Sequence, residues 1–108
     1  MHNIDVEAPR WIAGYERLAD TLADGYDMCI HEYTNDMSAR ELLERYSEHP
    51  TIRQFEQRIR MADEKIVAIL KPTKRCICGD YPTSHFWYWG YPPNSPELEN
   101  DLREIGAI

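Results

Sequence analysis

Apolar residues recur along the first third of the chain at steps of three and four, the spacing of one face of an α-helix. Pro9 stands near a suitable first turn of this helix, where its missing N–H is tolerated. Gly25 interrupts the pattern, which therefore predicts one long helix or two pieces broken near Gly25. Residues 26–33 fit a short strand as an alternative. The stripe consists of Trp11, Tyr15, Leu18, Leu22, Tyr26, Cys29 and Tyr33.

A polar stretch at residues 34–37 predicts a break before a second, shorter helix. Ser38 and Glu41 have the spacing of a capping box, in which each side chain satisfies a free N–H of the first turn. Pro50 cannot continue a helix, so it ends this one. Its apolar face consists of Ala39, Leu42, Leu43 and Tyr46.

A heptad repeat predicts a third helix, which begins after the capping pair Thr51 and Gln54. Cations occupy its g positions and carboxylates its e positions, an arrangement that sets partner and orientation in helix–helix seams. The seam packs either against the first helix of the same chain, antiparallel to it, or against a second copy in a homodimer. The large seam residues are Ile52, Phe55, Ile59, Ile66 and Ile69, with Ala62 among them; the g residues are Arg58 and Lys65, and the e residues Glu56 and Asp63.

The pattern changes after Pro72. Residues 74–78 fit a short strand, and residues 79–84 are rich in turn formers. The aromatic run at residues 85–89 favours β-structure. Together they predict a hairpin.

Ser95 followed by Pro96 is a favourable helix start, and Gly106 is a suitable stop. The predicted fold class is therefore mostly α: a small helical bundle of three main helices, a C-terminal β-hairpin-like aromatic segment and a short final helix. We expect one domain over residues 1–108. Its helical part covers about 8–71, and the cysteine-rich and aromatic hairpin with the final helix covers about 72–108.

The net charge of the 108 residues is −7, which argues against non-specific attraction to nucleic acid or to an anionic membrane. This charge is divided unevenly. Residues 1–50 hold eleven acidic and four basic side chains, a net of −7; residues 51–75 hold three and seven, a net of +4; residues 76–108 hold five and one, a net of −4. The basic segment either pairs with the acidic helices or marks a surface for an acidic partner.

Features of export and membrane insertion are missing from the pattern. The first seven residues have neither the basic nor the apolar region of a signal peptide. The longest aliphatic run, residues 66–70, is far shorter than the roughly 20 residues of a spanning helix. Three cysteines cannot all pair with one another, so we expect reduced thiols in a cytoplasmic protein and no membrane partner.

Cys76, Cys78 and His85 are candidate metal ligands because zinc prefers thiolate and imidazole. A fourth ligand would come from Cys29, His31 or Asp80. One residue separates the two cysteines, whereas zinc knuckles usually have two, and buried free thiols explain the same pattern. A zinc-stabilised interaction domain is thus the alternative interpretation, and no cofactor is the leading one.

The aromatic run is the first candidate for partner binding. In a strand, Phe86 and Tyr88 would face one way and Trp87 and Trp89 the other. A small domain cannot easily bury both faces, and exposed tryptophan and tyrosine anchor many interfaces.

The second candidate is an acidic stripe, the side chains Glu16, Asp20, Asp24 and Asp27 of the first helix. Carboxylates repeated along a helix can imitate the phosphates of nucleic acid. Because no catalytic motif accompanies these features, we expect a small acidic non-enzymatic protein that docks on a larger protein or nucleoprotein complex, without binding nucleic acid directly. Its specific form would be an inhibitor of nucleic-acid-handling machinery, of the anti-CRISPR or anti-restriction type.

Overall fold

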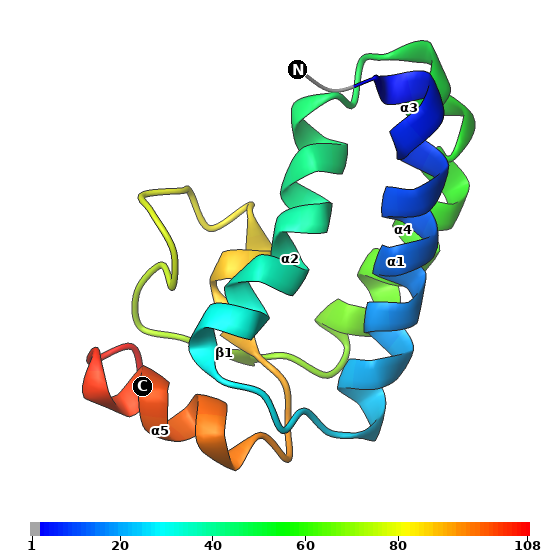
Figure 1. Ribbon diagram of the computed structural model, residues 1–108. Coiled ribbons are helices and arrows are strands. Elements are labelled where there is room, and N and C mark those ends of the chain that lie inside the picture. Colours follow the sequence, from blue (N-terminus) through cyan, green and yellow to red (C-terminus); the bar gives the residue numbers. More distant parts are fainter. Residues whose placement is uncertain (1–2) are drawn as a thin grey trace.

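The computed structural model describes residues 3–108 and confirms a mostly α fold with a two-stranded antiparallel sheet and a short final helix (Figure 1). The elements in chain order are α1 (Ile4–Asp24), α2 (Ile30–Arg45), α3 (Pro50–Gln54), α4 (Glu56–Val67), β1 (Lys71–Pro72), the 3-10 helix η1 (Phe86–Tyr88), β2 (Gly90–Tyr91) and α5 (Pro96–Glu104).

Helix α1 begins at Ile4, earlier than expected, so Pro9 lies inside the helix rather than in its first turn. The apolar stripe explains this start, because Ile4 and Ala8 continue it towards the N-terminus and are buried. The helix ends at Gly25, whose φ of 116° is a conformation that few other residues adopt. The break near Gly25 is confirmed. Residues 26–33 form no strand, because 26–29 are irregular and 30–33 are the first residues of α2.

Helix α2 runs without interruption through residues 34–37, so the predicted break is wrong. Ser38 does not cap a helix, since its hydroxyl donates to the carbonyl of Thr34 at 2.8 Å. The buried stripe of α2 crosses the polar stretch, and packing of that stripe outweighs the weak helix propensity of the residues between. The buried residues are Tyr33, Met37, Arg40 and Leu43.

The predicted heptad helix bends at Phe55 and forms α3 and α4. The first turn of α3 is capped by His49, whose Nδ1 accepts from the N–H of Thr51, in place of the expected capping box. Ile52 and Ile66 are buried in the core of the same chain. The other large seam residues, Phe55, Ile59 and Ile69, are partly buried against that core.

Helix α4 runs parallel to α1, so the expected antiparallel arrangement is wrong. Contacts between the two helices advance together along both, from Glu16 with Arg58 to Asp20 with Lys65. The reason is the insertion of α2, because each short connection reverses the chain and two reversals restore its direction (Figure 1). The predicted g cations therefore pair with α1.

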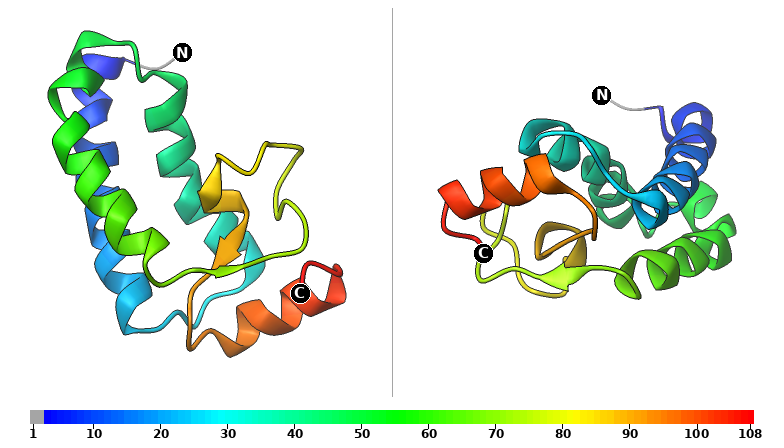
Figure 2. Two further views of the ribbon diagram at one scale, coloured as in Figure 1. Left: turned by 180° about the vertical axis from the view of Figure 1, so that it is seen from behind. Right: turned by 90° about the horizontal axis from the view of Figure 1, so that it is seen from below.

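On the side of the bundle opposite α1, the C-terminal segment covers α2 as far as Arg40, whose guanidinium lies 4.5 Å from the Trp87 ring. Helix α1 packs along both α2 and α4, whereas these two pack less closely with each other. Figure 2 shows α2 and α4 separated when the molecule is seen from behind.

The predicted hairpin is replaced by a two-residue ladder, in which Lys71 pairs with Tyr91 and Pro72 with Gly90. Residues 74–78 form no strand, and the aromatic run forms η1. A strand would send Trp87 and Tyr88 to opposite faces, whereas the 3-10 turn buries both in the one available core.

The final helix is confirmed, since α5 begins at Pro96 after Ser95 and ends before Gly106, which has a φ of 74°. It packs against α2. The carboxylate of Asp101 accepts the N–H of Ile30 at 2.9 Å, so α5 caps the first turn of α2.

Candidate functional site

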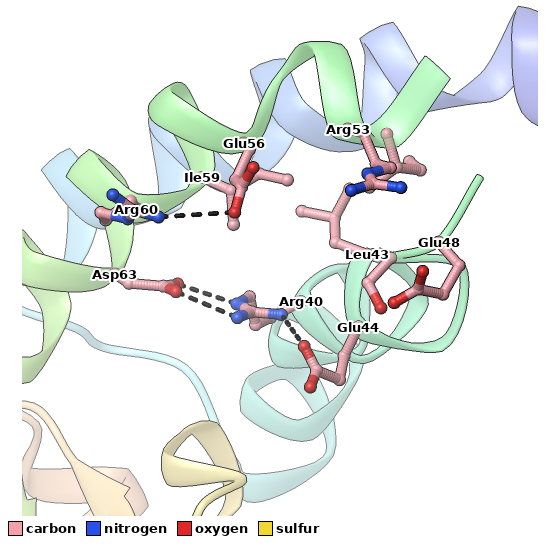
Figure 3. Close-up of a pocket in the computed structure, with 11 residues that line it drawn as sticks. Arg40, Leu43, Glu44, Glu48, Arg53, Glu56, Ile59, Arg60 and Asp63 are labelled. Atoms are coloured by element: carbon pink, nitrogen blue, oxygen red, sulfur yellow. Dashed lines mark hydrogen bonds and ion pairs between the residues drawn. The ribbon is translucent and has the colours of Figure 1, made fainter. Parts of the chain in front are cut away.

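A cleft of about 390 Å³ lies between α2 on one side and α3 and α4 on the other (Figure 3). This volume is within the usual range of ligand-binding clefts. It is lined by Arg40, Leu43, Glu44, Ser47, Glu48, Ile52, Arg53, Glu56, Ile59, Arg60 and Asp63. Three of these, Leu43, Ile52 and Ile59, are apolar.

A network around Arg40 crosses one end of the cleft. Its guanidinium donates from Nε and Nη2 to the carboxylate of Asp63, at 2.8 and 3.0 Å, and from Nη1 to Glu44 at 3.2 Å. The hydroxyl of Tyr15 donates to the same Asp63 at 2.6 Å. Burial and the neighbouring Asp63 raise the pKa of Tyr15 far above its ordinary value, so this hydroxyl stays protonated.

Arg40 also faces the aromatic segment. Its guanidinium carbon lies 4.5 Å from the centre of the Trp87 ring and 6.0 Å from that of Phe86. Both distances fall within the range of cation–π attraction. Arg40 is 9% exposed, so one buried cation joins α1, α2, α4 and η1 and fixes the spacing of the cleft walls.

The two walls of the cleft differ in charge. Glu44 and Glu48 project from α2 or the turn after it, and Arg53 and Arg60 project from α3 and α4 (Figure 3). Arg60 lies 3.4 Å from Glu56 in an exposed ion pair, and this pair offsets part of the positive charge of the α3–α4 wall. Among residues 3–108, neither Glu48 nor Arg53 forms an ion pair. With Arg40 and Asp63 paired to each other, the α2 side holds the carboxylates Glu44 and Glu48, whereas the other side holds two arginines and the carboxylate of Glu56, a net charge of +1.

The polar groups in the cleft are carboxylates, arginines and one hydroxyl. Asp63 is saturated by Arg40 and Tyr15, and Ser47 is the one hydroxyl among the described lining residues. Leu43 and Ile52, beneath these groups, are 1% and 2% exposed, so Ile59 is the apolar lining residue that is only half-buried.

The predicted acidic stripe is partly neutralised by α4. Glu16 forms hydrogen bonds with Arg58, which lower the pKa of the Glu16 carboxyl, and Asp20 lies 3.8 Å from Lys65. Asp24 and Asp27 remain exposed, but Asp27 lies beyond the end of α1. Internal pairing therefore accounts for half of the stripe.

The predicted aromatic site is divided between core and surface. Trp87 and Tyr88 are 2% and 3% exposed, so neither forms a surface patch. Phe86 and Trp89 are half-buried and line a second hollow of about 210 Å³, together with Val67, Leu70, Lys71, Pro72, Thr83 and Gly90.

The structure does not gather the predicted zinc ligands. Across residues 3–108, no group of three or more His, Cys, Asp or Glu side chains is placed to hold a metal ion. The thiol of Cys76 donates to the carbonyl of Cys78 at 3.1 Å. His85 stacks on Tyr81 and lies 3.6 Å from the Glu41 carboxylate. Both cysteines, like Cys29, are free thiols.

Sequence reasoning missed Arg40, the central residue of the site. A signal was present, because Tyr33, Met37, Arg40 and Leu43 follow helical spacing and place a cation within an apolar stripe. A buried arginine requires a carboxylate partner. The predicted break at residues 34–37 hid this stripe.

No protein-family model, curated protein or solved structure matches this chain. Within the part of the chain that the structure describes, no helix has the length and apolar character needed to cross a membrane.

Proposed function

We propose that this chain is a non-enzymatic binding protein that docks on a larger protein through the cleft between α2 and α3–α4. The observation that carries the proposal is the cleft of about 390 Å³, with Glu44 and Glu48 on one wall, Arg53 and Arg60 on the other, and the half-buried Ile59 in its floor. Charged walls select a partner of complementary charge, and an apolar contact adds affinity.

The Arg40 network supports this proposal because it organises the cleft before any partner arrives. Arg40 is held by two hydrogen bonds to Asp63 and by the Trp87 ring, so α2 and α4 keep their separation without a ligand. A preformed groove loses less conformational entropy on binding than a flexible one does.

The more specific role, inhibition of nucleic-acid-handling machinery, rests on the acidic stripe. It is supported by Asp24 and Asp27, which are exposed, and weakened by the pairing of Glu16 and Asp20. A cytoplasmic location fits the three free thiols, which an oxidising compartment would tend to oxidise. The zinc-stabilised alternative has no gathered ligand set to support it.

Site-specific photo-crosslinking in the native host tests the proposal. A benzophenone amino acid at position 53, on the cleft rim, should form a covalent adduct with one larger protein. The matched control carries the same amino acid at position 17, an exposed residue of α1 outside the cleft. Adducts that form equally from both positions, or from position 17 alone, would contradict docking through the cleft.

A further inference from the structure

Cys76 and Cys78 lie in the loop between β1 and η1, away from the cleft, which none of residues 74–80 lines. The thiol of Cys76 donates to the backbone carbonyl of Cys78 at 3.1 Å, so the Cys76 side chain is directed towards residue 78. Cys78 is exposed and Cys76 is half-buried, and both are free thiols. Two sulfur atoms that can bind a metal ion therefore lie in one short segment that solvent reaches.

Backbone hydrogen bonds hold this segment in place. The N–H of Ile77, the residue between the two cysteines, donates to the carbonyl of Tyr88 at 2.8 Å. The N–H of Lys74 donates to the carbonyl of Ala107 at 2.7 Å, and the Ile77 side chain packs against the core. Ligands on a backbone that is already fixed lose less conformational entropy when they bind an ion.

The number of donors decides which ion this pair of thiols suits. Within residues 3–108, no third His, Cys, Asp or Glu side chain joins the two thiols in an arrangement that could hold a metal ion. Structural zinc requires four ligands, so two sulfurs do not suit it. Cu(I) is a soft ion that prefers thiolate ligands and is stable with two of them in a linear arrangement.

The charges of the segment fit the same ion. Lys74, Arg75 and Asp80 give residues 74–80 a net charge of +1 when both thiols are protonated. Two thiolates and one Cu(I) form a complex with a charge of −1, because two negative sulfurs surround one positive ion. The positive charge of the segment therefore offsets the charge of the complex.

We propose that Cys76 and Cys78 form a two-coordinate site for Cu(I), bound between their sulfur atoms. Both thiols release their protons on binding, so one Cu(I) replaces two protons and copper keeps its oxidation state. The Cys76 sulfur exchanges its hydrogen bond to the Cys78 carbonyl for a bond to the metal. The site is independent of docking through the cleft, and neither proposal needs the other.

The three cysteines of the chain provide both the test variants and the control. The reduced full-length chain is titrated with Cu(I) against the competing chelator bicinchoninate, and we expect one Cu(I) per chain. Cys76→Ser and Cys78→Ser should each weaken binding at least about hundredfold, since loss of a group that merely orients a metal ligand already costs about 10–100-fold. Cys29→Ser removes the third thiol and should bind Cu(I) as tightly as the unchanged chain.

Two further measurements make these results specific. Cys78 is exposed, so Cys78→Ser should retain the fold, and circular dichroism checks this. X-ray absorption at the copper edge should show two sulfur neighbours and no nitrogen neighbour. Addition of Zn²⁺ at the same concentration should not displace the Cu(I).

Four outcomes would overturn the site. The first is a folded Cys78→Ser variant that binds Cu(I) as tightly as the unchanged chain. The second is an equal loss of affinity in Cys29→Ser. The third is half an equivalent of Cu(I) per chain together with a dimer in sedimentation, because one ion would then bridge two chains. The fourth is an imidazole nitrogen among the copper neighbours, because His85 would then belong to the ligand set.

Discussion

The two halves of α2 have the same neighbour, α1, yet only one of them is covered on its other side. In the first half, Tyr33 and Met37 are fully buried, and the Tyr33 hydroxyl donates to the carbonyl of Gly90 at 2.8 Å. In the second half, Leu43 is buried but the Glu44 side chain is 45% exposed to the cleft. The C-terminal segment covers α2 from Ile30, whose N–H is bound by Asp101, as far as Arg40 and Glu41, which contact Trp87 and His85.

This difference shows that the cleft is produced by where the cover ends rather than by a special sequence in α2. Arg40 marks the border, because Trp87 contacts it from the covered side and Asp63 binds it from the other. Contacts with the C-terminal segment stabilise the covered part of α2, whereas the uncovered part leaves side chains exposed to the cleft. The two halves should therefore respond differently to substitution.

The largest effect is expected on the covered side. Trp87→Ala removes a 2%-exposed ring and its contact with Arg40, and should lower the free energy of unfolding by about 4 kcal/mol. Urea denaturation monitored by circular dichroism measures the loss. Ser47→Ala, at the exposed rim, is the control and should change it by less than about 0.5 kcal/mol. Similar losses in both variants would remove the distinction between the halves.

Arg40→Met should cost about 3 kcal/mol, because it leaves the Asp63 carboxylate without its main partner in a largely buried position. Adding Asp63→Asn should restore most of the loss, since an asparagine is neutral and still accepts the Tyr15 hydroxyl. Thermal or urea unfolding of the three proteins decides this. A double variant no more stable than the single one would show that Arg40 acts through its packing on Trp87 alone.

Alkaline pH should destabilise the protein through its buried tyrosines. Burial raises the pKa of Tyr15, Tyr26 and Tyr33, with added effects of Asp63 on the first and Asp36 on the second. These groups stay protonated in the folded state but ionise near pH 10 in the unfolded chain. Stability is therefore intact below pH 10 and falls above it by about 1.4 kcal/mol per tyrosine for each pH unit.

Urea unfolding between pH 8 and about pH 11 tests this slope. Tyr33→Phe removes one of the three hydroxyls, and with it one proton from the linkage, so its stability should fall less steeply with pH. An unchanged slope in that variant would contradict the assignment to Tyr33.

The smallest effect is expected on the uncovered half. Glu44→Gln weakens an exposed pair with Arg40, and should lower the unfolding free energy by about 0.4 kcal/mol at low salt. The loss should diminish in high salt. A cost above about 1.5 kcal/mol would mean that Glu44 belongs to the buried network rather than to the surface.

Local signals in the sequence were sufficient for the helix ends that depend on local chemistry. Gly25 ends α1, and Ser95 with Pro96 begins α5. The low helix propensity of Thr34 and Asp36 favours a break at 34–37. That prediction was wrong because burial of Tyr33 and Met37 stabilises the helix there.

The aromatic run shows the same limit. The residues of this run favour β-structure because their side chains pack well on a half-buried sheet. The sheet of this protein is a two-residue ladder, which offers no such surface. The core accepts Trp87 and Tyr88 from one side, so a 3-10 turn replaces the strand. Likewise, Arg40 and Asp63 are 23 residues apart, and no local pattern identifies one as the partner of the other.

The hydrogen bond from the N–H of Ile30 to Asp101 affects when the first turn of α2 is completed during synthesis. The two residues are 71 positions apart, so the ribosome adds 71 residues after Ile30 before the capping carboxylate is present. At 5–20 residues per second this delay is about 4 to 14 s, far longer than a helix needs to form. Before that, α1, α2 and α4 have all been made. The helices that form the walls of the cleft are thus synthesised while the covered side of α2 is still without its C-terminal contacts.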